Sequence, residues 1–203
     1  TELPLTISAI EATQGIQSLT DPVALIAGKP TIVRAYLQSN SGTVPGVKGT
    51  LYASNNGGST WVSVQAQNAP ATAVLPGEFD RGNDRHALRF TLPQSMWSGT
   101  VLIYAEAYLD PGGARTQSTQ ASLSFISVDP ISVGYVSIAY NGASPDPGRI
   151  AGAQQYMGSL YPMQAVGYFP VPVSVPYFGG HSPSFVKLYL NAIYLWHDLF
   201  GWP

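Results

Sequence analysis

The chain has 203 residues, 45% of them hydrophobic, which is enough to bury one large core or two small ones. Only 10% of the residues are charged, and the net charge of -2 gives no electrostatic basis for binding nucleic acid or an anionic membrane. The absence of cysteine excludes a disulfide framework and a thiolate site.

Glycine and proline are frequent, with 21 and 17 residues, and they gather in short clusters between apolar runs. Such clusters favour many strands joined by tight turns over long helices. A transmembrane helix needs a run of about 18 or more apolar residues, and the sequence has no run of that length. No membrane span is therefore expected. The surplus of small polar residues and tyrosine over lysine and glutamate indicates a secreted or cell-surface protein.

The stretch with the clearest pattern of apolar and polar residues runs from Ile7 to Leu37. An apolar segment, Ile7–Ala12, is followed by a polar break at Thr13–Gly15 and by a second apolar segment, Val23–Ile26. Thr31–Leu37 then alternates with period two, which is typical of a strand with one buried face. We interpret the stretch as the edge strand and first core strands of a β-sandwich.

Strand patterns continue to residue 128. Asn55–Gly58 is predicted to be a hairpin turn, because asparagine and glycine tolerate the positive φ that such turns need. The other predicted strands are Gly46–Ala53, Thr60–Val64, Ala87–Leu92, Gly99–Leu109 and Thr116–Val128. Residues 1–128 are therefore predicted to form an antiparallel, Ig-like β-sandwich module of seven to nine strands.

Residues 129–203 follow a different pattern. Ile131–Tyr140 has apolar residues on both parities, Gly148–Tyr161 has a helical pattern, and Val171–Val175 is a short apolar run. Ser182 and Pro183 supply an N-cap and a first-turn proline for a helix over 184–200. The prediction is a mainly β chain: a sandwich followed by a small α/β segment of strand, helix, strand and helix.

The helix predicted over 184–200 is apolar on nearly all sides, so it needs cover on most faces. The segment of about 75 residues is too small to wrap it. We expect the helix to pack on the sandwich, on another copy of the chain, or on a further part of a longer protein. Its candidate interface residues are Phe185, Tyr189, Ile193, Trp196 and Phe200.

Several of these stretches carry a family resemblance. ISAIEATQGIQ with LIAGKPTIVRAYL, and RHALRFTLPQSMWSGTVLIYAEAYLD, resemble the β-sandwich region of large secreted metallopeptidase-like proteins. ISVGYVSIAY is similar to the first strand of the peptidase-like unit that follows it there. The resemblance implies an accessory module next to a peptidase-like unit.

The zinc motif of those peptidases, His-Glu-x-x-His, is not present. The three histidines are His86, His181 and His197; none precedes a glutamate, and no glutamate follows Glu106. No catalytic residues can therefore be carried over from the family to this chain.

Two sets of residues are candidate ligand sites. Glu78, Asp80, Asn83 and Asp84 surround a glycine and could supply oxygen ligands to Ca²⁺. Their spacing does not match an EF-hand, so a solvated loop in which Arg81 and Arg85 pair with the acids is the favoured alternative. The four aromatic residues Trp61, Trp97, Tyr104 and Tyr108, together with Tyr52, could form a platform for the sugar rings of a polysaccharide. Core and cross-strand packing is the alternative for these aromatic residues.

Three functions remain open. The first is a non-catalytic extracellular accessory or interaction module of a secreted peptidase-like protein, with the rest of that protein as its partner. The second is a structural subunit of an extracellular filament or surface layer, in which a strand such as Leu3–Ile10 is donated to a neighbouring copy. The third is a carbohydrate-binding module that uses the aromatic residues.

Overall fold

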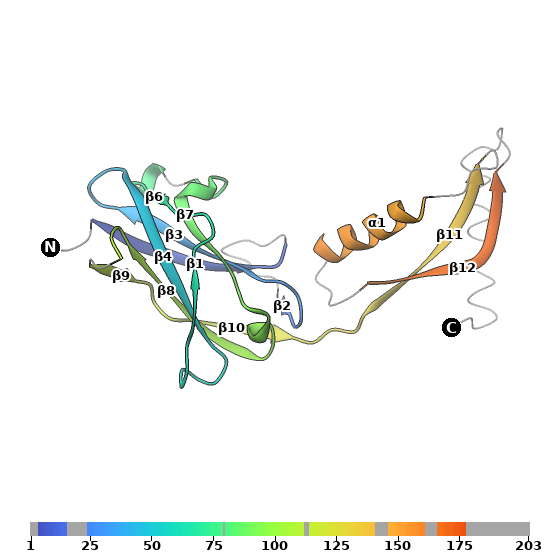
Figure 1. The fold of residues 1–203 in the computed structure, drawn as a ribbon, viewed down its shortest axis with the longest axis horizontal. Helices are drawn as coiled ribbons and strands as arrows, with labels where there is room; N and C mark the ends of the chain where they lie inside the picture. Colours follow the sequence, from blue (N-terminus) through green and yellow to red (C-terminus); the bar gives the residue numbers. More distant parts are fainter. Residues whose placement is uncertain are drawn as a thin grey trace. The chain divides into compact units, whose positions relative to one another are not determined.

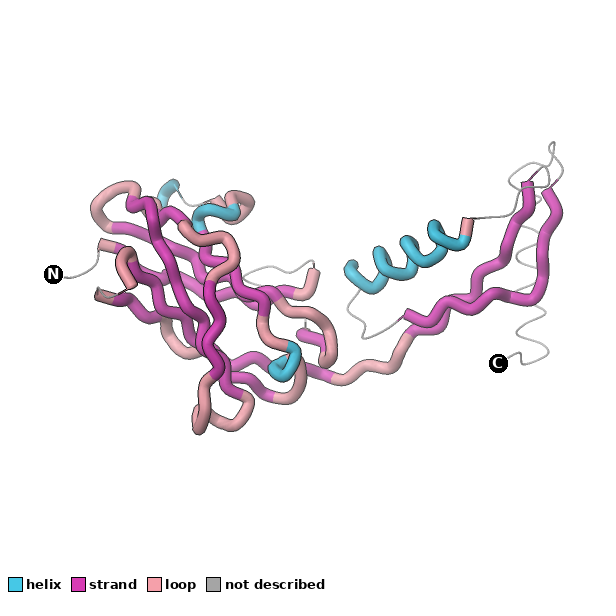
Figure 2. Tube along the Cα trace, viewed as in Figure 1, coloured by secondary structure: helices cyan, strands magenta, loops and turns pink. Residues whose placement is uncertain are grey.

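The computed structural model describes residues 4–15, 24–78, 80–111, 114–140, 146–160 and 166–177. It divides the chain into two compact units: residues 1–131 with 156–166, and residues 132–155 with 167–203. Figure 2 shows that strands dominate the first unit, with short helical turns between them. The prediction of a mainly β fold with antiparallel sheets is confirmed.

The smaller sheet of the first unit has three antiparallel strands in the order β1-β3-β7 (Figure 1). Their bounds are β1 Leu5–Thr13, β3 Ile32–Ser39 and β7 Ala87–Thr91. The stretch Ile7–Leu37 thus contains most of the edge strand β1 and of the central strand β3 of this sheet.

The larger sheet has the order β2-β10-β8-β4-β5, with β6 pairing β4 and β9 pairing β8. All of its described pairings are antiparallel except the short parallel contact of β2 with β10. Its strands are β2 Leu25–Ile26, β4 Val44–Ser54, β5 Val62–Gln65, β6 Ala71–Ala73, β8 Thr100–Tyr108, β9 Arg115–Gln117 and β10 Ala121–Ile126.

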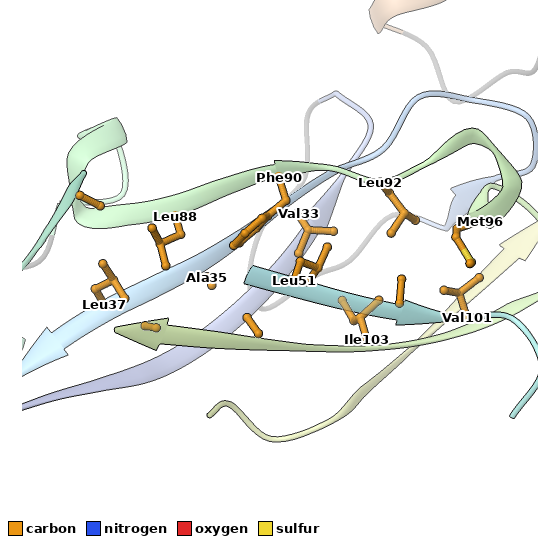
Figure 3. Packing of buried hydrophobic residues seen from close by; sticks show 14 of the residues in the cluster. Val33, Ala35, Leu37, Leu51, Leu88, Phe90, Leu92, Met96, Val101 and Ile103 are labelled. Carbon is orange, nitrogen blue, oxygen red and sulfur yellow. The ribbon is translucent and has the colours of Figure 1, made fainter. Parts of the chain in front are cut away.

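The two sheets pack face to face around one hydrophobic core (Figure 3). Alternate residues of each strand point inward, as period-two patterning requires. On β8 the inward side chains Val101, Ile103, Ala105 and Ala107 are all fully buried, as the sequence predicts. From the smaller sheet Val33, Leu37, Leu88 and Phe90 enter the same core. This arrangement is a β-sandwich.

β1 changes its inward parity part-way along the strand. Leu5 and Ile7 pack against the core at its start, and Ile10 and Ala12 do so at its end. The register against β3 shifts between Ile7 and Ala9, which is a β-bulge at Ser8. The bulge keeps apolar side chains on the core face along the whole strand.

The prediction of one closing strand over Thr116–Val128 is wrong in detail. β9 and β10 both pair with β8, but their registers differ by one residue, and residues 118–120 lie between them. Ser118 explains the break, because its hydroxyl accepts the Ala105 N–H at 3.0 Å while its own N–H donates to the Ala105 carbonyl at 2.9 Å. A side chain thus takes the place of a backbone acceptor in the ladder.

The turn predicted at Asn55–Gly58 connects β4 to β5. Gly57 and Gly58 have φ of 70° and 88°, the left-handed region that glycine adopts without strain. The Ser54 hydroxyl and the Asn56 amide close the turn: they accept the N–H groups of Gly58 and Thr60 at 2.9 and 3.0 Å. Three short 3₁₀ helices lie in other connections of the unit: η1 Pro76–Glu78, η2 Asp84–His86 and η3 Gln94–Met96.

The described part of the second segment runs strand, helix, strand: β11 Ile131–Tyr140, α1 Pro147–Leu160 and β12 Val166–Tyr177. The two strands pair, and their arrows point toward the same end in Figure 1. β12 is longer than predicted and continues through Pro170, Pro172 and Pro176. These three prolines share one parity, so the N–H groups they lack all belong to one edge of the strand.

The helix predicted over 184–200 lies outside the described residues, and so do its candidate interface residues. Among the helices that the structure describes, none is long and apolar enough to cross a membrane.

Candidate functional site

Three aromatic side chains meet on the outward face of the larger sheet. Tyr52 of β4 lies directly opposite Tyr104 of β8, and their rings stack with centroids 4.8 Å apart and planes 12° apart. Trp61, just before β5, packs edge-on against Tyr104 with centroids 4.9 Å apart and planes 72° apart. All three side chains are partly exposed. Because offset-stacked and T-shaped contacts favour fixed ring positions, the three rings support one another.

A charged pair adjoins these rings. Glu106 follows Tyr104 on the outward face of β8, and its Oε2 accepts hydrogen bonds from Arg115 Nη1 at 2.9 Å and from the Tyr52 hydroxyl at 3.3 Å. The Arg115 guanidinium lies 4.5 Å from the Tyr108 ring centroid. We call Tyr52, Trp61, Tyr104, Glu106 and Arg115 the outer cluster.

The surroundings of Tyr52 in the outer cluster raise the pKa of its hydroxyl. Burial raises the pKa of the Tyr52 hydroxyl, and the negative charge of Glu106 and the hydrogen bond to it raise the pKa further. The hydroxyl therefore remains a donor to Glu106 at neutral pH. The result is a surface that combines ring edges, a carboxylate and a guanidinium in fixed positions.

The four aromatic residues predicted as a sugar platform are only partly brought together. Trp61 and Tyr104 are in contact. Trp97 instead packs against the core and donates its indole N–H to the Leu92 carbonyl at 2.7 Å. Tyr108 is 7% exposed beneath Arg115, and Tyr104 presents its ring to Tyr52. Trp97 and Tyr108 therefore do not join Trp61 and Tyr104 in one exposed group of rings, and sugar binding stays a prediction.

Three of the four predicted calcium ligands, Asp80, Asn83 and Asp84, contact other groups of the protein. Asp80 Oδ1 accepts the Gly82 N–H at 2.8 Å, and Asn83 Oδ1 accepts the Arg85 N–H at 3.0 Å. Asp84 forms an ion pair with Arg89, with 3.2 Å between Asp84 Oδ2 and Arg89 Nη1. In the described ranges, no group of three or more His, Cys, Asp or Glu residues is placed to hold a metal ion. The described contacts of Asp80, Asn83 and Asp84 are thus with the protein, and the calcium site stays a prediction.

A buried ionic network on the smaller sheet is absent from the predicted sites. The carboxylate of Glu11 on β1, 6% exposed, is bonded both to the Tyr36 hydroxyl and to the Arg81 guanidinium. Arg81 belongs to the loop where the calcium site is predicted, and it was expected to pair with the acids of that loop. In the structure it forms an ion pair with Glu11 of β1. In the sequence, this network was indicated only by Glu11, the charged residue of a strand that is otherwise uncharged.

Neither the protein-family models nor the curated proteins contain a match to this chain. The resemblance to metallopeptidase-like proteins therefore remains a prediction from the sequence.

Proposed function

We propose that the sandwich is a non-catalytic, extracellular interaction module and that the outer cluster is its binding surface for a protein partner. The observation that carries this proposal is the contact of Trp61 with Tyr104 beside the Glu106–Arg115 pair. Tryptophan, tyrosine and arginine are the residues enriched at the energetic centres of protein interfaces.

Preorganisation favours binding at this surface. A side chain that must be immobilised on association costs about 0.5–1.5 kcal/mol, and ring contacts that already exist reduce this cost. Arg115 is held by Glu106, by the Pro111 carbonyl and by the Tyr108 ring, so its guanidinium has a defined position. A partner with an apolar contact and an acidic group beside it would match the outer cluster.

The proposal places the module outside the cell, next to a peptidase-like unit of a longer protein. Its support is the low charge content and the sequence resemblance of residues 5–140. The filament alternative is less favoured, because β1 already pairs with β3 and buries Leu5 in the core of its own sandwich. Donation of this strand to a neighbouring copy would first have to break those contacts.

A photo-crosslinking amino acid at the position of Trp61 tests the proposal in the extracellular fraction of the source cells. The matched control carries the same group at Leu75, an exposed apolar side chain outside the outer cluster. We expect one discrete protein product from the Trp61 position, competed away by excess unlabelled wild-type chain but not by a Tyr104→Ser variant. Equal products from both positions, or a product that wild-type chain does not compete, would overturn the proposal.

Polysaccharide affinity electrophoresis separates the sugar-binding alternative. The proposal predicts unchanged migration of the wild type in each polysaccharide gel. Retardation that is lost in Trp61→Ala would instead assign the outer cluster to a carbohydrate.

A further inference from the structure

The outward face of the smaller sheet carries an arginine whose buried Nε has no hydrogen-bond partner among the residues that the structure describes. The antiparallel register places Glu11 of β1, Arg34 of β3 and Arg89 of β7 in one row across the three strands. Opposite charges in facing positions normally pair, so Arg34 is expected to bond Glu11. No such bond forms in the structure, and the Glu11 carboxylate is bonded to two other residues.

Tyr36 and Arg81 are the groups that occupy Glu11. The Tyr36 hydroxyl donates to Glu11 Oε2, and Arg81 Nη2 donates to Glu11 Oε1. Arg81 Nε also donates to Glu11 Oε2, at 3.4 Å. The Arg34 guanidinium instead lies over the Tyr36 ring, 5.2 Å from its centroid. Arg34 Nε is buried, and no acceptor among the described residues bonds it. A buried N–H without an acceptor is destabilising, so an acceptor that bonds Arg34 would be favoured.

Arg89 adds a second cation next to Arg34. The two residues are direct cross-strand neighbours, an arrangement of like charges that destabilises a sheet unless an anion lies between or beside them. Arg89 has one carboxylate partner, Asp84, and both side chains are largely exposed, so that pair is weak. Among the described residues, Arg81 forms an ion pair with Glu11 and Arg89 forms one with Asp84, whereas Arg34 forms none.

We propose that Arg34 and Arg89 form a binding site for a carboxylate group. A carboxylate is planar and carries two acceptors, which match the fork of a guanidinium, and it would supply a negative charge beside Arg34. The site is on the opposite sheet from the outer cluster and is independent of it. The carboxylate could belong to a small dicarboxylate or to an acidic side chain of a peptide, and the test distinguishes these sources.

The test follows the arginine Nε–H resonances of the ¹⁵N-labelled chain during titration with sodium succinate, with sodium chloride at equal ionic strength as the reference. The Arg34 signal is identified by its loss in Arg34→Gln. We expect a saturable shift of that signal with succinate and no comparable shift with chloride. Arg89→Gln, at an exposed position, should weaken binding about tenfold, the loss of one charged hydrogen bond.

Arg115→Gln is the control, because it removes the same charge from the other sheet; it should leave the succinate affinity within about twofold of wild type. A second titration uses a hexaglutamate peptide at equal carboxylate concentration. A similar affinity per carboxylate identifies a general carboxylate site, whereas peptide binding about tenfold tighter identifies an acidic partner segment. Absence of a saturable Arg34 shift with both probes, or equal affinity in Arg89→Gln and wild type, overturns the proposal.

Discussion

Leu88 of β7 fills the space that a side chain at Gly49 of β4 would need. A methyl group on Gly49 would lie 2.4 Å from Leu88 Cδ1 and 2.6 Å from the Glu106 carbonyl oxygen. The Leu88 contact joins the two sheets, whereas the Glu106 contact is with the backbone of the neighbouring strand β8. Glycine at this position therefore allows Leu88 to reach the opposite sheet and brings the two layers together.

Gly49→Ala is expected to lower the free energy of unfolding by about 2–4 kcal/mol, because overpacking in a core costs about 1–3 kcal/mol and a clash with backbone relaxes poorly. Urea denaturation followed by tryptophan fluorescence measures this change. Gly77→Ala is the matched control, since nothing lies within 4 Å of a methyl group there. The packing argument fails if the two variants lose equal stability.

The Gln14 side chain joins the end of β1 to the 26–31 turn. Its Nε2 donates to the carbonyls of Ile26 and Lys29 and to the Thr31 hydroxyl at 2.9, 3.2 and 2.9 Å, and its Oε1 accepts the Ile26 N–H at 2.7 Å. Gln14→Glu keeps the shape but places an oxygen against three acceptors. We expect a loss of about 2–3 kcal/mol in the free energy of unfolding at neutral pH.

The control for Gln14 is Gln94→Glu, which introduces the same charge at an exposed position of η3. It should change the free energy of unfolding by no more than about 0.5 kcal/mol. Equal effects of the two variants would show that charge alone, rather than the lost donor, accounts for the change.

We expect ionisation of the Tyr36 hydroxyl to lower the free energy of unfolding in alkali. Burial raises the pKa of its hydroxyl, and the hydrogen bond to Glu11 raises it further. The folded-state pKa therefore exceeds the unfolded value near 10. The stabilisation is fully present below the unfolded pKa and is lost as the pH rises through the folded pKa.

Tyr36→Phe removes this titration but also the bond to Glu11. The variant should be less stable by about 1–2 kcal/mol at pH 7 and should lose less stability than wild type between about pH 10 and 12. Urea unfolding at a series of pH values measures both effects. A variant curve parallel to that of wild type through the alkaline range contradicts the argument.

Trp61 and Tyr104 should be coupled energetically. A double-mutant cycle with Trp61→Ala and Tyr104→Ala is expected to give a coupling free energy of about 0.5–1.5 kcal/mol for their edge-to-face contact. The cycle of Trp97→Ala with Tyr104→Ala is the control, since Trp97 packs against the core and bonds Leu92. Its coupling should be below about 0.5 kcal/mol. Zero coupling in the Trp61 cycle would remove the support for a preorganised cluster.

Features that depend on local sequence were predictable. Alternation along β8 identified the inward residues, and Asn55–Gly58 identified a hairpin turn. The helical pattern over 148–161 corresponds to α1 within one residue at each end. Each of these depends on periodicity or on a residue's φ preference, which neighbouring residues are sufficient to reveal.

Features that depend on distant partners were not predictable. Glu11 and Arg81 are 70 residues apart in the chain, and Tyr52 meets Tyr104 only because β4 pairs with β8 in one register. Periodicity indicates which face a residue occupies but not which residue faces it across the sheet. The bulge at Ser118 likewise depends on a side chain replacing a backbone acceptor, which the apolar pattern does not record.

The most direct test of the binding function is a calorimetric titration of the purified partner, isolated through the Trp61 crosslink, into wild type, Trp61→Ala and Leu75→Ala. We expect Trp61→Ala to weaken the binding free energy by about 2 kcal/mol or more, which is the loss typical of an interface hot spot. Leu75→Ala should bind as wild type does. Equal affinities of Trp61→Ala and wild type would contradict the assignment of the outer cluster as the binding surface.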